Sequence, residues 1–198
     1  VSVFTMPRHV LHYRADSKTT NGEQGLGFDF LQLADPQFGM FRSFAQRSPE
    51  KRAAVWERFR RVDMVGEDDP DILEGVKDLA PEQHRLDAAI DAANAERPAF
   101  VAICGDLVNN IDQPEQVDAF HACMARLSPD IPVHVVPGNH DLSTSFDAPT
   151  SDGLSEYRAR FGPDYYSFRH EHTLFLALNS ETLYSAEHLP GADAAQLD

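Results

Sequence analysis

The chain has 198 residues, of which 17 are basic and 32 acidic, and its net charge is −15 at pH 7. A surface this negative repels phosphate backbones, and no stripe of Lys and Arg with interleaved aromatic residues offsets it, so we expect no nucleic-acid partner. No apolar run approaches the roughly 18 residues that cross a bilayer, so we expect no membrane partner either.

The amino-terminal residues and the cysteines indicate in which cellular compartment the protein is expected. Residues 1–10 lack a basic segment followed by an apolar core, so they show no secretory signal. Cys104 ends an apolar run and Cys123 falls in a predicted helix, so we expect two buried thiols and not a disulfide. These features predict a reducing compartment, and we expect a cytoplasmic protein.

The first part of the chain predicts an arm, a strand and an insertion. Residues 1–27 are mixed and are interpreted as an N-terminal arm, since the Lys18-Thr19-Thr20 sequence lacks the glycines of a phosphate-binding loop. An apolar run over 28–34 predicts the first strand. Residues 39–80 form an insertion with a helix over 49–62. Its acidic turn at 66–71 lacks the spacing of a calcium loop and is expected to be solvated.

The middle of the chain alternates between helices and strands. Helical spacing predicts helices over 82–96 and 114–127, and apolar runs predict strands over 99–104 and 131–136, with His134 as a packed core residue. This order is typical of right-handed βαβ crossovers and a parallel sheet. A short helix over 154–161 and two strands over 165–169 and 173–179 follow, joined by a turn at His170-Glu171.

Polar residues follow each of the three predicted parallel strands. Parallel strands put their carboxyl ends on one edge of the sheet, where ligands bind, so these residues are expected to share one cleft. The candidates are Asp35, Gln37, Asp106, Asn139 and His140.

The residue types in this cleft suit divalent cations. Carboxylate and amide oxygens with some imidazole bind Mg²⁺, Mn²⁺, Fe or Zn²⁺, and a carboxylate such as Asp35 or Asp106 can bridge two such ions. A pair of ions activates a water and holds the oxygens of a phosphoryl displacement. His140 would serve the leaving oxygen, and Asp141 would fix the tautomer of His140. The candidate catalytic residues are therefore His140 and Asp141.

Three motifs in this order carry a resemblance to a known family. ADPQ at 34–37, GDLVNN at 105–110 and PGNHD at 137–141 resemble the first three motifs of the calcineurin-like metallophosphoesterases. PDYYSFRHEHTLFLALNS at 163–180, followed by QLD at 196–198, is most similar to a subgroup of serine/threonine phosphatases. The resemblance covers residues 28–198, which we take as the phosphoesterase domain.

The resemblance implies an α/β fold of four layers, an α/β/β/α sandwich with a di-metal site at the strand ends. Asp35 and Gln37 would bind the first metal, Asp106 would bridge, and Asn139 would bind the second. His140 would be the catalytic imidazole. Asn109 or Asn110 would support the loop without being a ligand.

Two departures from the family matter. Most members have His where Gln37 stands, and an amide oxygen is a weaker donor. The family also completes its site with later histidines, including a Gly-His-x-His segment, and the chain ends at Asp198 before them. His170 and His172 are rejected as substitutes, because they flank a turn and lack the preceding Gly. We therefore expect a C-terminally incomplete domain with an exposed apolar face, poorly soluble or oligomeric.

The function expected from the resemblance is metal-dependent hydrolysis of a phosphate ester, in a phosphoprotein or a small phosphomonoester. Three alternatives stay open. The first is a phosphodiesterase, and the second is a non-catalytic metal-binding or regulatory module, which Gln37 and the missing histidines favour. The third is a nucleotide-binding protein that uses the glycines at 22–27, and it ranks last.

Overall fold

The computed structural model describes residues 27–61, 73–142 and 148–185, together with residues 187, 189, 191 and 196. Its first sheet has three parallel strands in the order β1-β2-β3: β1 (Leu31–Ala34), β2 (Val101–Cys104) and β3 (Val133–Val136). Each lies within an apolar run from which a strand was predicted, but is two or three residues shorter. The parallel sheet is thus confirmed.

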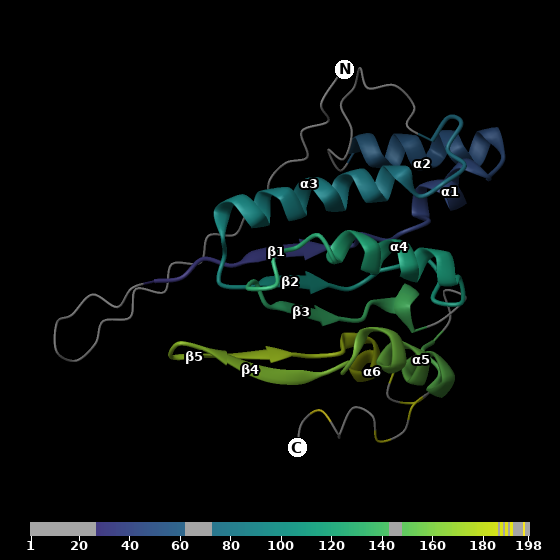
Figure 1. Ribbon diagram of the computed structural model, residues 1–198. Helices are drawn as coiled ribbons and strands as arrows, with labels where there is room; N and C mark the ends of the chain where they lie inside the picture. Colours follow the sequence, from purple (N-terminus) through teal and green to yellow (C-terminus); the bar gives the residue numbers. More distant parts are fainter. Residues whose placement is uncertain are drawn as a thin grey trace.

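Two helices cover one face of this sheet. Helix α3 (Ala80–Glu96) has Pro in its first turn and buries Leu86 and Ile90, while α4 (Pro114–Met124) buries Val117 and Phe120. These side chains form one core with Val101 and other residues of β2. The four-residue spacing in α3 and the three-residue spacing in α4 put the apolar residues on the inner face of each helix. Figure 1 shows α3 on one side of the molecule and the second sheet on the opposite side.

The second sheet is an antiparallel hairpin of β4 (Tyr166–His170) and β5 (Thr173–Ala177). Its inner face packs on the first sheet through rings: Phe168 stacks on His134 with centroids 3.4 Å apart, and also on Phe175. Phe100 meets Phe168 edge to face. The hairpin is confirmed. His134 packs against its rings as expected but is only half-buried, and this partial burial lowers the pKa of His134.

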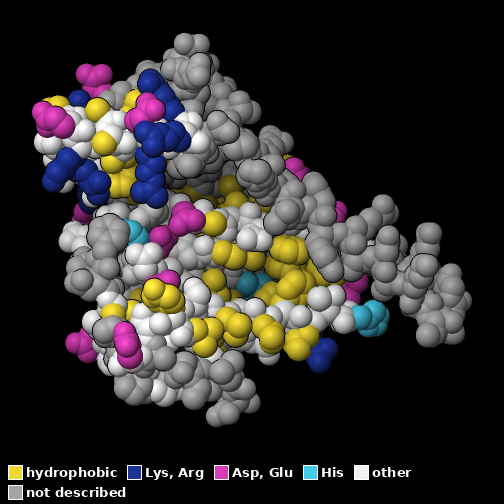
Figure 2. Space-filling view, turned by 180° about the vertical axis from the view of Figure 1, so that it is seen from behind, with side chains coloured by type: hydrophobic (Ala, Val, Ile, Leu, Met, Phe, Trp, Pro, Cys, Tyr) yellow, Lys and Arg dark blue, Asp and Glu magenta, His cyan; other side chains and the backbone are white. Residues whose placement is uncertain are grey.

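The outer face of the hairpin is apolar and exposed. Leu174, Leu176 and Leu178 are all exposed, Leu176 to 64%. Figure 2 shows hydrophobic side chains gathered over this two-stranded sheet. The expected exposed apolar face is therefore present. Within the described ranges, no helix has both the length and the apolar character needed to cross a membrane.

The remaining helices include two that were not predicted. Helix α2 (Pro49–Arg61) and helix α5 (Ser151–Phe161) confirm the predictions, although α5 begins three residues early because Thr150 caps it through Gly153 N. Helices α1 (Met40–Ala45) and α6 (Ser180–Tyr184) are too short for a periodic signal. Three predicted features lie outside the described residues: the arm up to residue 26, the acidic turn at 66–71 and Asp198.

A contact from α3 explains why α1 forms. Glu82 of α3 is buried, and its Oε1 accepts a hydrogen bond of 2.8 Å from the backbone N of Phe41. This amide lies in the first turn of α1, where backbone N–H groups have no partner within the helix. Phe41 in turn packs against Phe59 of α2 in a second small core. A side chain 41 residues away therefore stabilises the start of α1.

Candidate active site

The three parallel strands end level with one another. Ala34 pairs with Cys104, and Cys104 pairs with Val136, so the next residues along the chain emerge at one edge of the sheet. Backbone pairing continues past the strand ends: Gln37 N donates to Asp106 O at 2.8 Å. This register brings the predicted motifs together, as parallel-strand topology requires.

Three of the predicted site residues have left-handed backbone conformations. The φ angles of Asp35, Gln37 and Asp106 are 51°, 39° and 48°, and Gly105, directly before Asp106, has φ 77°. Such conformations cost energy in a non-glycine residue and persist only where the surroundings enforce them, often at functional sites. The backbone is thus bent to present these side chains at the sheet edge.

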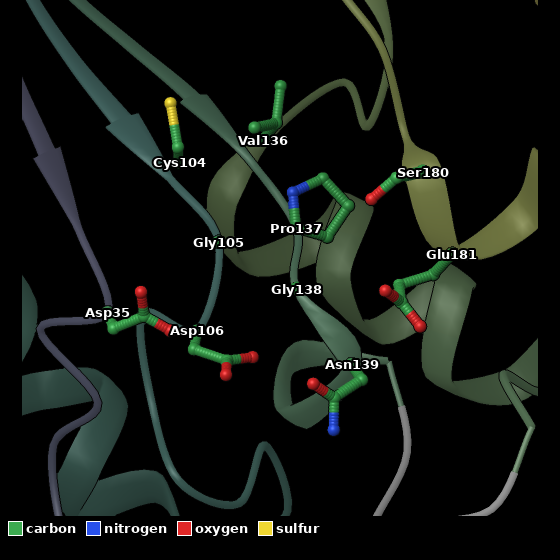
Figure 3. A pocket seen from close by; sticks show the side chains of 10 residues that line it. All are labelled: Asp35, Cys104, Gly105, Asp106, Val136, Pro137, Gly138, Asn139, Ser180 and Glu181. Carbon is green, nitrogen blue, oxygen red and sulfur yellow. The ribbon is translucent and has the colours of Figure 1, made fainter. Parts of the chain in front are cut away.

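Asp35, Asp106 and Asn139 line one cavity of about 240 Å³. Figure 3 shows the two carboxylates next to each other on adjacent loops, with Asn139 beyond them. Partial burial raises the pKa of Asp35; the charge of Asp106 and a hydrogen bond with it raise this pKa further, and His140 lowers it. Two acidic groups this close favour a cation between them.

Gly138 makes the close packing around Asp106 sterically allowed. A Cβ atom at position 138 would lie 2.3 Å from Asp106 Oδ1 and 2.5 Å from Asp106 N, so any side chain would displace this carboxylate. The same Oδ1 accepts a hydrogen bond of 3.0 Å from the backbone N of His140. The third motif therefore positions Asp106 through its backbone.

The imidazole of His140 is held by the second motif. Its Nδ1 lies 2.8 Å from the carbonyl oxygen of Asn109. A carbonyl only accepts, so this hydrogen bond requires the proton on Nδ1. We predicted that Asp141 fixes the tautomer, but the structure puts the Asn109 carbonyl against Nδ1.

Asp141 has a different task. It is fully buried, and its carboxylate accepts hydrogen bonds of 3.1, 3.1 and 2.9 Å from the backbone N atoms of Leu107, Val108 and Gly138. Burial raises the pKa of Asp141 to about 7, and the three hydrogen bonds act in the opposite direction. Its carboxylate joins the loop after β2 to the turn after β3, so its role is to position those loops.

Gln37 lies beside this cavity and not in its lining. Its side chain is buried, with Nε2 3.5 Å from Asn109 Oδ1. Asn109 thus contacts both Gln37 and His140, and its backbone N donates to Phe38 O and Gln116 Oε1. The expectation that Asn109 supports the loop agrees with these contacts. Neither Gln37 nor His140 belongs to the described lining of the cavity.

Sequence reasoning missed Glu181 and Ser180, which line the cavity from α6. Figure 3 shows Glu181 entering from the side opposite Asp35. Burial, and then the charge of Asp106, raise the pKa of Glu181. Asn179 caps α6 by accepting from Glu181 N and Thr182 N, so an Asn directly after an apolar strand was the available signal.

Cys104 corrects a prediction. We expected it to be buried, but it is exposed and lines the cavity, because it is the last residue of β2. Cys123 is buried as expected, and both cysteines are free. Partial desolvation of the thiol against the cavity wall, and then the charge of Asp35, raise the pKa of Cys104.

The rejected histidine pair lies away from the site. His170 packs its ring on Phe28, with centroids 4.5 Å apart, and His172 is exposed in the hairpin turn. His188 lies outside the described residues.

The donor set around Asp35 and Asp106 fits a hard divalent cation, because carboxylate and amide oxygens are the atoms such ions prefer. Across the part of the chain that the structure describes, no three His, Cys, Asp or Glu side chains are grouped to hold a metal ion. Amide oxygens, from Asn139 in the lining and Gln37 beside it, would therefore have to supplement the two carboxylates. Asp35, Asp106 and Asn139 are the residues that the cavity brings together for such an ion.

Comparison with known proteins shows the family of the chain. The family model of the calcineurin-like phosphoesterases matches residues 30–190. "Serine/threonine-protein phosphatase CPPED1" of Bos taurus is 30% identical over 82% of this chain and 46% of its own length, and that of Rattus norvegicus is 31% identical over 85% and 48%. The chain thus spans about half the length of these relatives.

A solved structure of purple acid phosphatase PPD1 from yellow lupin (Lupinus luteus) seeds is also similar. Its TM-score is 0.43 at 14% identity, over 89% of this chain and 33% of that one. The family model covers most of the chain, and its match includes all three strand-end motifs. The chain belongs to the calcineurin-like phosphoesterase family.

Proposed function

We propose that this protein hydrolyses phosphate monoesters with the help of two divalent cations. The observation that carries the proposal is the meeting of Asp35 and Asp106 in one cavity with Asn139, at the strand ends of a chain that belongs to a phosphoesterase family. The left-handed backbone at Asp35 and Asp106 is typical of functional sites and supports ligand binding there.

The strand-end residues would hold the cations. Asp35 and Gln37 would bind the first, Asp106 would bridge, and Asn139 would bind the second. When bound, the ions supply positive charge for the phosphate oxygens and lower the pKa of a water molecule. Mn, Fe, Mg and Zn all accept such donors, and the amide at Gln37 favours the ions that prefer oxygen ligands.

His140 would act on the leaving oxygen of the ester. Because the Asn109 carbonyl keeps a proton on Nδ1, proton transfer to the substrate would use Nε2. The imidazole donates there when it is cationic. The hydrogen bond at Nδ1 also fixes the direction of the ring, which general acid catalysis requires.

The substrate class that we propose is a phosphoserine or phosphothreonine protein. The printed name of the relatives, serine/threonine-protein phosphatase, supports this class over a phosphodiester. We also propose a reducing compartment such as the cytoplasm, which the two free cysteines support.

The test is the hydrolysis of p-nitrophenyl phosphate with added Mn²⁺. Asp106→Asn and His140→Ala should each lower kcat by about 10²- to 10⁴-fold, the usual effect of losing a general acid or a charged group at the reaction centre. The matched controls Asp118→Asn and His84→Ala change exposed residues on α4 and α3 and should retain activity.

Two results would count against this function. Equal activity in the wild type, Asp106→Asn and His140→Ala would remove the mechanism. Calorimetric binding of Mn²⁺ that is lost in Asp106→Asn, without any turnover by the wild type, would instead identify a non-catalytic metal-binding module.

A further inference from the structure

A second cavity, of about 380 Å³, lies beside the candidate active site. Its lining is polar and rich in amides and contains two cationic side chains; the residues used below are Arg42, Lys77, Asn109, Asn110, Gln46 and Gln113. We call this cavity the amide groove. Its volume is in the range of sites that bind small ligands or a few side chains.

The amide groove shares a wall with the catalytic residues. Asn109 lines it and also holds the imidazole of His140 through its carbonyl oxygen. Gly39, another lining residue, lies two positions after Gln37. Asn109 therefore lies between the groove and His140. The groove and the cavity lined by Asp35 and Asp106 share no lining residue, and Asn109 connects the groove to the site through its hydrogen bond to His140.

The segment that contributes Arg42 to the amide groove is basic, unlike the chain as a whole. Residues 40–61, which include α1 and α2, contain seven basic and two acidic residues, whereas the chain carries −15. Figure 2 shows Lys and Arg side chains gathered at this corner of the molecule. Such a local reversal attracts anions to one side of an otherwise repulsive surface.

The two cations of the groove are Arg42 and Lys77. Arg42 forms an ion pair of 2.7 Å with Glu115 Oε1, and the Glu115 side chain is half exposed. Lys77 is exposed at the rim. An incoming carboxylate could bind Lys77 directly and would compete with Glu115 for the guanidinium of Arg42. Exposed ion pairs are weak enough for this exchange.

We propose that the amide groove binds the peptide next to the phosphorylated residue of the substrate, and that it selects acidic side chains there. The proposal rests on the function proposed above. Asn110, Gln113 and Gln46 carry amides that both donate and accept, as an extended peptide backbone requires. Arg42 and Lys77 supply the charge that an Asp or Glu of the peptide would need.

The test compares two phosphoserine peptides of equal length, one with Asp and Glu beside the phosphoserine and one with Asn and Gln. The ratio of their kcat/KM values should favour the acidic peptide and fall with added salt. Lys77→Gln and Arg42→Gln should each reduce this ratio by about threefold, the effect of one exposed ion pair. Glu115→Gln should increase it, because Arg42 loses its competing partner.

Arg169→Gln is the matched control, because it removes one exposed Arg from β4, outside the groove. A ratio near one in the wild type, or an equal loss in Arg169→Gln, would overturn the proposal. The proposal would also be overturned if Lys77→Gln lowered kcat/KM for a bisphosphorylated sugar as much as for the acidic peptide, since the groove would then bind any second anion.

The two proposals fail in different ways. Absence of p-nitrophenyl phosphate hydrolysis would count against the function, whatever the peptides do. In that case fluorescence anisotropy with the same two peptides still tests the groove. Tighter binding of the acidic peptide, weakened in Lys77→Gln, supports it, and equal binding refutes it.

Discussion

His140 Nδ1 lies 2.8 Å from the carbonyl oxygen of Asn109, so the imidazole of the third motif is oriented by the backbone of the second. Mutation cannot remove a carbonyl, but it can move the loop that carries it. The amides of Asn109 and Asn110 donate to Gln116 Oε1 at 3.1 and 2.9 Å, and Gln116 is buried under the loop. Gln116 is therefore the side chain through which this loop can be tested.

Gln116→Leu should lower kcat with little change in KM, because it leaves Asn110 N without this acceptor and frees the loop that orients His140. The free energy of unfolding should fall by about 1–3 kcal/mol, the cost of leaving a buried donor unpaired. Gln116→Glu keeps an acceptor and should recover most of the activity. Steady-state kinetics and urea unfolding measure both effects; a Leu variant with normal kcat would contradict the positioning role.

Gly138→Ala should weaken Mn²⁺ binding by about tenfold or more, an effect typical of disturbing the surroundings of a metal ligand. The new Cβ would lie 2.3 Å from Asp106 Oδ1, so this carboxylate must move. Isothermal titration calorimetry measures the affinity without requiring turnover. Asp118→Asn serves as the control here too. An unchanged affinity in Gly138→Ala would mean that Asp106 is not a ligand.

Asp141→Asn should destabilise the fold by about 2–3 kcal/mol, in the range of hydrogen bonds to a charged group. An amide has one acceptor oxygen, and its NH₂ group would face the backbone donors of Leu107, Val108 or Gly138. Urea unfolding should show a lower midpoint with an unchanged slope. If stability is unaffected and only kcat falls, Asp141 acts in chemistry and not in holding the loops.

Glu82 gives the free energy of unfolding a pH dependence of definite sign. Burial raises its pKa in the folded state above the ordinary value of 4.5, although hydrogen bonds from Phe41 and Gly39 and the charge of Arg85 oppose this. The folded state then binds more protons than the unfolded state, so stability falls as the pH rises from about 4.5 through the raised pKa. Glu82→Gln should remove this decrease. If Glu82 does not contribute, the urea midpoint will change with pH to the same extent in the wild type and in Glu82→Gln across that range.

Leu176→Thr should reduce self-association through the outer face of the hairpin. The Leu176 side chain is 64% exposed beside Leu174 and Leu178, and burying a leucine between two copies stabilises contact by about 1.5–3 kcal/mol. The association constant should thus fall about tenfold or more in sedimentation experiments. Tyr184→Ser is the control, since Tyr184 is 92% exposed and lies outside this row. An equal effect of both substitutions would show that Leu174, Leu176 and Leu178 do not form the contact between two copies.

Several features of the fold follow from local sequence. The apolar runs before Asp35, Gly105 and Pro137 specify buried parallel strands, and the helical spacing between them specifies the crossovers. Because parallel strands end on one edge, the sequence alone also predicts that Asp35, Asp106 and Asn139 meet, and the cavity confirms it. The strand ends, and hence the positions of the three polar motifs, are encoded within a few residues of each strand.

The roles of the surrounding residues depend on contacts between distant parts of the chain. The pairing of His140 with Asn109 spans 31 residues and that of Glu82 with Phe41 spans 41, and neither has a periodic or spacing signal. Glu181 reaches the cavity only because the hairpin folds onto the first sheet. Sequence therefore determined that Asp35, Asp106 and Asn139 meet at the sheet edge, but not that Glu181 joins them or that Gln37 and His140 stay out of the lining. Tertiary packing decided which atoms orient the imidazole, which carboxylate braces the loops and where the amide groove forms, because those choices depend on distances that only the folded chain defines.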